Sequence, residues 1–287
     1  MSLIWWPAPA KLNLGLRVVG RRPDGYHELQ TVFQIIDLAD ELAFEPRSDG
    51  TITRLSDAAS GADALAAVAP GDDLCVRAAL ALRAASGLRT GVTIRIRKRI
   101  PLGGGLGGGS SDAATTLCVL DRLWDTRLGA AELAKLGLAL GADVPVFVHG
   151  HSAVGEGVGE RLTPVSLPAR WFLVLHPGVA VATKDVFQAP ELTRNSAILT
   201  IPALLASGDG NDCEPVVRQR FPDVAAALDW LGGYASARLT GTGACIYATF
   251  ESADAAAEVA RKVPPRWRSW VVRGLSDSPL RKRLEEV

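Results

Sequence analysis

The sequence predicts an α+β fold with two domains. Its 287 residues are enough for about two domains, each able to bury a core of its own. Strand-like and helix-like segments are interleaved without the regular strand, helix, strand alternation of a doubly wound parallel sheet. The sequence texture changes after Gly150, so we place a boundary near residue 161 and expect domains of residues 1–161 and 162–287.

The first elements are two predicted strands joined through a turn. Residues 10–19 alternate polar and apolar side chains, which is typical of a half-buried strand and places Lys11 and Asn13 on one face. Residues 22–25, Arg-Pro-Asp-Gly, have the composition of a turn, because proline sets φ and glycine permits a positive φ. Residues 28–36 form the next predicted strand.

A helix and a third strand follow. Residues 74–85 have a helical pattern, and Asp72 and Asp73 before them are candidate N-caps. Residues 92–97 alternate again, with Val, Ile and Ile on the buried face.

The next predicted elements are a glycine-rich loop over residues 102–111, a helix over 112–124 and a second helix over 130–140 that ends at Gly141. Asp143 follows that helix directly. Beyond residue 161 the clearest signals are an apolar run at 171–175 and a late strand pair around 238–250.

The composition excludes several classes of function. The chain has 31 Lys+Arg and 31 Asp+Glu, which argues against a basic nucleic-acid-binding surface and against an acidic tail. The longest stretch without a charged side chain, residues 195–208, is too short for a membrane-spanning helix. The N-terminus has no pattern of a secretory signal, and the four cysteines are far apart, so we expect free thiols in a cytoplasmic protein.

Glycine is the residue type in excess, with 29 in the chain, and six of the seven residues from Gly103 to Gly109 are glycine. Because a predicted helix follows this loop, free backbone N–H groups and the positive end of the helix dipole meet there. The loop therefore predicts a phosphate site and not a flexible tether. We expect Ser110, Ser111 and Asp112 to cap the helix, and a serine hydroxyl to bind a phosphate or its Mg²⁺.

Other phosphate-binding loops do not fit. A Walker A loop ends in Gly-Lys-Ser/Thr, but no lysine follows Gly109. The His-Arg-Asp and Asp-Phe-Gly triplets of protein kinases do not occur in the chain. A dinucleotide-binding loop precedes an acidic strand end by about 20 residues, and no clear one follows here.

Residues 101–111 match completely the loop Pro-x-Gly-Gly-Gly-Leu-Gly-Gly-Gly-Ser-Ser, and through it the chain resembles the GHMP kinase superfamily. Further segments resemble one branch, the kinases that act on 4-diphosphocytidyl-2-C-methyl-D-erythritol, and they occur in family order. These segments are residues 8–14 with 22–27, residues 140–147, residues 239–245 and, at the C-terminal end, residues 278–280.

The resemblance implies an N-terminal ATP-binding domain like domain 2 of ribosomal protein S5, a C-terminal ferredoxin-like α/β sandwich, and an active site in the cleft between them. It implies ATP-dependent phosphorylation of the 2-hydroxyl of 4-diphosphocytidyl-2-C-methyl-D-erythritol, giving the 2-phosphate and ADP, in the non-mevalonate isoprenoid pathway. The expected partners are this small molecule, ATP and Mg²⁺, with no nucleic acid and no membrane. We expect a monomer or a weak homodimer.

The residues supply candidates for the chemistry. A kinase acting on an alcohol must accept the proton of the hydroxyl and offset charge on the transferred group. Asp143 is the candidate base, because carboxylates are ionised at neutral pH, and Lys11 is its candidate partner. The resemblance places both in the active site.

The resemblance also assigns binding residues. For ATP they are Lys98, Pro101, Leu102, Gly103, Gly104, Gly105, Leu106, Gly107, Gly108, Gly109, Ser110 and Ser111. For the substrate they are Asn13 at the methylerythritol hydroxyls, Tyr26 and Phe187 stacked on cytosine, His27 at the cytosine edge, and Gly241, Thr242 and Gly243 near the phosphates.

Two alternatives stay open: another GHMP kinase of small alcohols, such as homoserine or mevalonate, or a catalytically inactive nucleotide sensor on the same fold. Asp73 departs from the asparagine that the family commonly has there, which puts adenine contacts through this side chain in doubt. His149 and His151 form a histidine pair without a third ligand in sequence, so we expect no protein metal site.

Overall fold

The computed structural model describes residues 3–56, 71–207 and 210–286, and its elements give the expected α+β class. The strands are β1 (Trp5–Arg21), β2 (His27–Arg47), β3 (Ile52–Ser56), β4 (Gly91–Arg97), β5 (Ala153–Gly157), β6 (Arg161–Pro164), β7 (Trp171–His176), β8 (Ala237–Leu239), β9 (Ile246–Phe250) and β10 (Arg268–Leu275). The helices are α2 (Leu74–Ser86), α3 (Gly108–Leu123), α4 (Gly129–Leu138), α5 (Val144–His149), α6 (Thr183–Phe187), α7 (Ile201–Ser207), α8 (Glu214–Arg220), α9 (Pro222–Gly232), α10 (Ala253–Ala260) and α11 (Pro279–Glu286).

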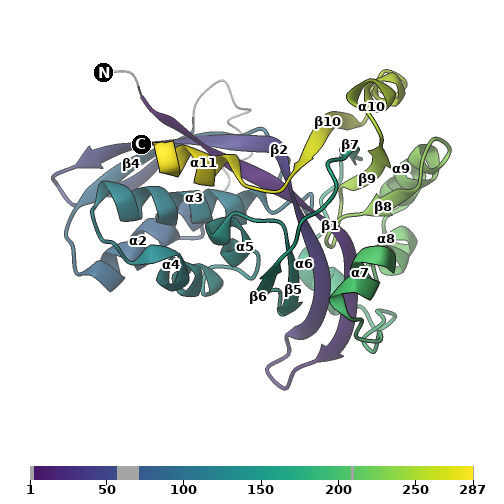
Figure 1. Ribbon diagram of the computed structural model, residues 1–287, viewed down its shortest axis with the longest axis horizontal. Coiled ribbons are helices and arrows are strands. Elements are labelled where there is room, and N and C mark those ends of the chain that lie inside the picture. The colour runs from purple at the N-terminus through teal and green to yellow at the C-terminus, as the bar shows by residue number, and fades with distance from the viewer. Residues whose placement is uncertain (1–2, 57–70, 208–209, 287) are drawn as a thin grey trace.

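Strand β2 is the centre of the sheet. The sheet order is β3-β4-β2-β10-β7-β9-β8, and β2 also pairs with β1 along most of its length and with β5. The junction between β2 and β10 has two opposed pairs, Ile36 with Gly274 and Ile35 with Leu275. Figure 1 shows the consequence: β1 and β2 run through the middle of the molecule, with α2 to α5 toward one end and α8 to α10 toward the other.

Two main hydrophobic cores lie at the two ends of this sheet. The first packs the β2 and β4 side chains against α2, α3 and α5, and Leu280 of α11 belongs to it. The second packs β7 and β9 against α8 and α9, and it includes Leu16 and Val18 of β1. The division near residue 161 stays a prediction, since β1 contributes to both cores and α11 returns to the first.

Several predicted elements are confirmed. Strand β4 buries Val92, Ile94 and Ile96, and α2 begins after Asp73, which caps it by accepting from the N–H groups of Cys75 and Val76. All four cysteines are free thiols. Within the described ranges, no helix combines the length and the apolar character needed to cross a bilayer.

The expectation of a half-buried first strand is wrong. Lys11 and Asn13, on the predicted polar face, are each 3% exposed. The reason is that two distant loops cover this face: the Lys11 N–H donates to the carbonyl oxygen of Leu106, and the Asn13 N–H donates to Thr240 Oγ1.

Candidate active site

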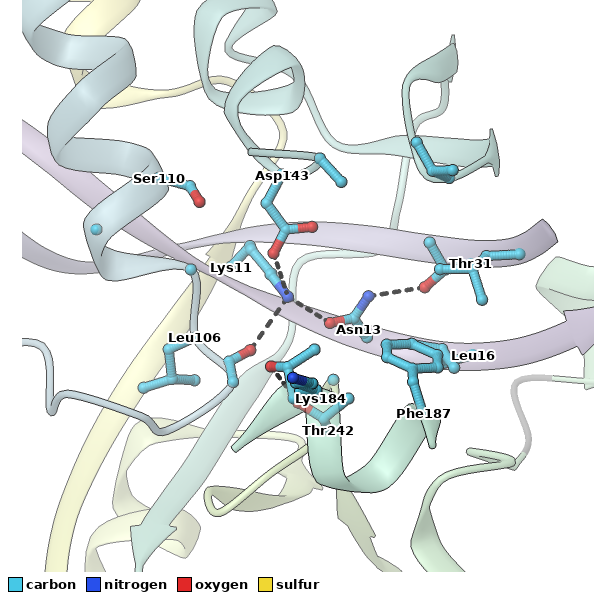
Figure 2. A pocket seen from close by; sticks show the side chains of 18 of the residues that line it. Lys11, Asn13, Leu16, Thr31, Leu106, Ser110, Asp143, Lys184, Phe187 and Thr242 are labelled. Atoms are coloured by element: carbon cyan, nitrogen blue, oxygen red, sulfur yellow. Dashed lines mark hydrogen bonds and ion pairs between the residues drawn. The ribbon is translucent and has the colours of Figure 1, made fainter. Parts of the chain in front are cut away.

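Lys11 and Asp143 form an ion pair at the centre of the site (Figure 2). Lys11 lies on β1, and Asp143 is the residue that precedes α5. Lys11 Nζ lies 3.2 Å from Asp143 Oδ2. The same ammonium donates to Asn13 Oδ1 at 2.5 Å and to the carbonyl oxygen of Gly105 at 3.1 Å. Because an ammonium has three donors, Lys11 is fully engaged, and its role in this geometry is to orient and neutralise the carboxylate.

The Asn13 amide is fixed in turn. Its Nδ2 donates to Thr31 Oγ1 at 2.8 Å, and the Thr31 hydroxyl donates to the carbonyl oxygen of Gly15 at 2.6 Å. Thr31 therefore sets which amide atom faces the Lys11 ammonium, and the oxygen is the one that accepts from it.

The glycine loop packs closely on the chain from Thr240 to Cys245. The Cys245 N–H donates to the carbonyl oxygen of Gly104 at 3.0 Å. A Cβ on Gly105, whose φ is +72°, would lie 2.4 Å from the carbonyl oxygen of Thr240. The glycines therefore serve close packing of the protein on itself as well as leaving room for a phosphate.

Helix α3 begins at Gly108, and its N-cap is Gly107, with φ +73° and no side chain that could cap it. The prediction that Ser110, Ser111 and Asp112 cap the helix is wrong, because these residues lie inside it. The Ser111 N–H already bonds the carbonyl oxygen of Gly107, so the N–H groups of residues 108–110 are the ones without a partner inside the helix. With the helix dipole, they form an anion site.

The two serines differ in position. Ser110 lines the cavity, and Figure 2 shows its hydroxyl pointing toward the side where Asp143 lies. Ser111 is fully buried and does not line the cavity, and its Oγ has no hydrogen-bond partner among residues 3–56, 71–207 and 210–286. Ser110 is therefore the better placed of the two to bind a phosphate or its metal ion.

Lys98 lies beneath the start of α3 in a buried cluster of charges. Its ammonium pairs with Asp40 and, at 2.7 Å, with Asp112. Burial disfavours the charged lysine, but the two carboxylates outweigh it and raise the pKa of Lys98. Burial raises the pKa of Asp112, an effect that Lys98 opposes. Lys98 lines the cavity with its charge already paired with these two carboxylates.

The turn from Gly241 to Gly243 lies beside the glycine loop. Asn211 supports it by donating from Nδ2 to the carbonyl oxygens of Leu239 and Gly241 at 3.0 and 2.7 Å. The Thr242 hydroxyl lies 3.0 Å from the hydroxyl of Thr183 at the start of α6. Gly241 and Thr242 line the cavity, whereas Gly243 does not.

At the other end of the cavity, the rings of His27 and Phe187 are stacked, with centroids 5.0 Å apart and an angle of 22° between planes. His27 is 8% exposed, and its Nε2 accepts a hydrogen bond from Arg194. Tyr26 lines the same part of the cavity but is 63% exposed. The structure thus brings all three predicted residues together, with Phe187 against His27 and Tyr26 at the open rim.

One cavity of about 890 Å³ holds the site, within the size range of small-molecule pockets. Every predicted site residue lines it except Ser111 and Gly243. Asp73 does not line it, because one carboxylate oxygen caps α2 and the other pairs with Arg54. No group of three or more His, Cys, Asp or Glu side chains arranged for a metal ion occurs in the part of the chain that the structure describes.

Sequence reasoning missed several residues that build the site: Thr31, Asp40, Lys184, Arg194 and Asn211. Lys184 lines the cavity, and its ammonium makes no hydrogen bond or ion pair with any described residue. Asp40 is fully buried, but no sequence signal distinguished it, because Asp37, Glu41 and Glu45 are also acidic residues of β2. The others lie outside every motif and are recognised by their partners only.

Comparisons with known proteins give one family for both halves of the chain. The family model "GHMP kinases N terminal domain" matches residues 73–151, and "GHMP kinases C terminal" matches residues 189–268. A 4-diphosphocytidyl-2-C-methyl-D-erythritol kinase of Alkalilimnicola ehrlichii is 55% identical over 279 residues, 97% of this chain and 94% of that protein. One of Halorhodospira halophila is 52% identical over 285 residues, 98% and 96% of the two chains.

Solved structures show the same fold. A crystal structure of a 4-(cytidine 5'-diphospho)-2C-methyl-D-erythritol kinase has a TM-score of 0.76 and 35% identity, covering 94% of this chain and 99% of its own. A homoserine kinase from Cytophaga hutchinsonii has a TM-score of 0.71 at 19% identity, covering 97% and 96%, which shows likeness of fold alone.

Proposed function

This chain belongs to the 4-diphosphocytidyl-2-C-methyl-D-erythritol kinases of the GHMP kinase family, and we propose that its site transfers the γ-phosphoryl group of ATP to the 2-hydroxyl of 4-diphosphocytidyl-2-C-methyl-D-erythritol. The observation that carries this proposal is the Lys11–Asp143 pair, which lines the same cavity as the start of α3. A proton acceptor and an anion site are the two things that phosphoryl transfer to an alcohol requires.

Asp143 accepts the proton of the 2-hydroxyl as that oxygen attacks the γ-phosphorus. Its side chain is 33% exposed and lines the cavity, while Lys11 holds one of its oxygens. The positive charge of Lys11 stabilises the carboxylate and the alkoxide that forms beside it.

The unpaired N–H groups at the start of α3 bind the phosphate oxygens of ATP, and the loop before them forms the wall of the nucleotide subsite. The donor set fits Mg²⁺, which binds few protein ligands together with substrate phosphates: the Ser110 hydroxyl lines the cavity and would be an oxygen ligand. When bound, Mg²⁺ neutralises charge on the transferring phosphoryl group.

The cytidine end of the substrate lies at His27, Phe187 and Tyr26, where an aromatic surface and an imidazole are available for a base. The substrate diphosphate then passes Lys184, Thr242 and Arg21, which line the cavity. Lys184 is suited to this diphosphate because, unlike Lys11 and Lys98, it is not paired with a carboxylate among the described residues.

An ADP-release assay tests the proposal. We expect turnover with 4-diphosphocytidyl-2-C-methyl-D-erythritol and a large loss, mainly through KM, with 2-C-methyl-D-erythritol 4-phosphate, which lacks the cytidine contacts. Equal kcat/KM on both alcohols would remove the role assigned to His27, Phe187 and Tyr26. If the protein turned over neither alcohol, the proposal itself would be contradicted.

The setting of the enzyme is also a proposal. We infer that the protein acts in the cytoplasm as a monomer or weak homodimer, because its thiols are free and one chain supplies every residue assigned to the site. Sedimentation velocity across a concentration series tests the oligomeric state, and a tight dimer at the lowest concentration would contradict it.

A further inference from the structure

Arg194 ties together the two rings at the cytidine end of the cavity. Its Nε donates to His27 Nε2 at 3.1 Å. Its Nη2 donates to the carbonyl oxygens of Phe187 and Ala189 at 3.0 and 2.7 Å, and Nη1 donates to that of Leu192 at 3.0 Å. One guanidinium therefore fixes both the His27 ring and the end of α6 that carries Phe187.

The direction of the bond to His27 follows from chemistry. A guanidinium has five N–H donors and no acceptor, so the nitrogen that it contacts must offer a lone pair. In a neutral imidazole only one nitrogen does so, and the proton then resides on the other. We propose that Arg194 is a positioning residue that fixes His27 as the tautomer protonated on Nδ1 and thereby makes the site select cytosine over uracil.

His27 Nδ1 is available for this task. It makes no hydrogen bond with any described residue, and it is not among the buried polar atoms that lack a partner, so it remains accessible from the cavity that His27 lines. Arg194 itself does not line that cavity and acts on a ligand through His27 alone. The stacking of His27 on Phe187 holds the ring plane, and Arg194 sets which nitrogen carries the proton.

The tautomer decides which pyrimidine fits. The Watson–Crick edge of cytosine has acceptors at N3 and O2, whereas N3 of uracil carries a proton and is a donor. An Nδ1–H group complements the cytosine N3 lone pair and opposes the uracil N3–H. A site with a fixed donor rejects the mismatched base because two groups are then left unpaired. The inference rests on the proposed function and deepens it by naming what selects the base.

The electrostatic surroundings keep His27 neutral. Burial lowers the pKa of His27, and the charges of Arg194 and Arg21 lower it further. The other charged groups that line the cavity with it are Asp24 in the turn, Lys184 on α6 and, around the ion pair at the centre of the site, Lys11, Asp143 and Lys98. Near neutral pH the ring therefore has a single proton on its two nitrogens, and the nitrogen that carries it decides which base the ring can bond.

Arg194→Met tests the proposal, measured with the cytidine substrate and with its uridine counterpart. We expect KM for the cytidine substrate to rise about tenfold at pH 8, the value for one lost hydrogen bond, while KM for ATP is unchanged. The ratio of kcat/KM for cytidine over uridine falls by at least as much. Arg194→Lys, which keeps a donor near Nε2, retains more of that ratio.

The pH dependence separates tautomer control from a loss of shape. Without the Arg194 charge, one of the causes that lower the pKa of His27 is removed, while burial, the largest cause, remains. Lowering the pH from 8 to 6 then increases the fraction of rings that carry a proton on both nitrogens and so have the Nδ1–H donor, and KM for the cytidine substrate falls part of the way back in Arg194→Met. In the unmodified enzyme Nδ1–H is present in both charge states, and the same pH change leaves this KM unaffected by His27.

Arg218→Met is the matched control, because Arg218 is a surface arginine paired with Asp229, and it leaves both substrates unaffected. If Arg194→Met weakens both substrates equally at both pH values, Arg194 has a structural role only and the proposal is overturned.

A measurement on the unmodified protein does not depend on any variant folding. In ¹⁵N NMR of the histidine-labelled protein, with His27 assigned through His27→Gln, we expect Nδ1 to be protonated and Nε2 to bear the lone pair. The opposite assignment overturns the proposal even if the kinase activity is confirmed. If the unmodified enzyme showed no activity on either the cytidine substrate or its uridine counterpart, the proposed function would be contradicted, and the tautomer result would still hold.

Discussion

At the residue scale, the proposed role of Asp143 as the proton acceptor can be tested by substitution. Asp143→Asn keeps the size of the side chain and removes the proton acceptor, so we expect kcat to fall by about 10² to 10⁴-fold. Nucleotide affinity is retained, because the α3 N–H groups stay in place. The measurements are ADP release and titration with ATP.

Asp229→Asn, which changes an exposed carboxylate on α9, is the control for Asp143→Asn. Normal turnover in Asp143→Asn would show that another group accepts the proton. Loss of ATP binding together with turnover would indicate that Asp143 maintains the structure of the cleft.

Single residues also show what the sequence could predict. The alternation in residues 10–19 placed Lys11 and Asn13 on one face, and the observed bond between them agrees. The motif around Asp143 predicted a candidate base, but no pattern could predict Arg194, because its three carbonyl partners and His27 come together only in the folded chain.

At the scale of elements, the effect of adding a side chain to the glycine loop can be measured. Gly105→Ala places a Cβ 2.4 Å from the carbonyl oxygen of Thr240 at a residue with φ +72°. The loop must shift away, and the Gly105 carbonyl, which accepts from Lys11, shifts with it. We expect a loss of about 1 to 3 kcal/mol in the free energy of unfolding, and a kcat reduced by more than tenfold.

Gly232→Ala is the matched control for the glycine loop, because no atom lies within 4 Å of the added Cβ and the residue is helical. It should leave kcat unchanged and stability equal or slightly higher. Urea unfolding and ADP release report the two quantities. A Gly105→Ala enzyme with unaltered kcat would show that the loop does not position Lys11.

The boundary of α3 shows the limit of prediction at this scale. The apolar spacing after Asp112 indicated the helix correctly, but a run of glycines normally argues against helix and hid its start at Gly108. Packing overrides that preference: a Cβ on Gly108 would lie 2.9 Å from Ile100, so the first turn exists where only glycine fits. Sequence alone carries no record of such a neighbour.

At the scale of the whole molecule, the sheet is continuous through a short junction, and Gln34 secures it. The Gln34 side chain is buried, and its Nε2 donates to the carbonyl oxygen of Leu275 at 2.8 Å and lies 3.1 Å from Ser152 Oγ. Gln34→Ala removes one hydrogen bond from each of these groups, which keep the bond that Ser152 Oγ donates to the Leu275 carbonyl oxygen, and it leaves a cavity at the junction. We expect the free energy of unfolding to fall by about 1 to 3 kcal/mol in urea.

Gln219→Ala, an exposed substitution on α8, is the control for this prediction and should leave the unfolding midpoint unchanged. A Gln34→Ala protein with the midpoint of the unmodified protein would show that the two strand pairs between β2 and β10 suffice without this side chain.

The overall fold class was predictable, because the periodicity of long segments indicates which are strands and which are helices. How these elements pack together was less predictable. The balanced charge of the chain gave no hint that the cavity holds two lysines paired with buried or partly buried carboxylates and a third, Lys184, that pairs with none of the carboxylates the structure describes. Such pairing depends on β1, β4 and α3 meeting, which local patterns do not encode.

The return of α11 to the first core has a consequence for synthesis. Leu280 packs among the side chains of that core, and Arg122 on α3 donates to the carbonyl oxygen of Leu284. A ribosome makes residues 279–286 after the whole second core, so the first core is complete only after the second has left the exit tunnel. During translation, part of the apolar surface of the first core therefore stays exposed until α11 has been made. We expect a chaperone to bind the chain at this stage.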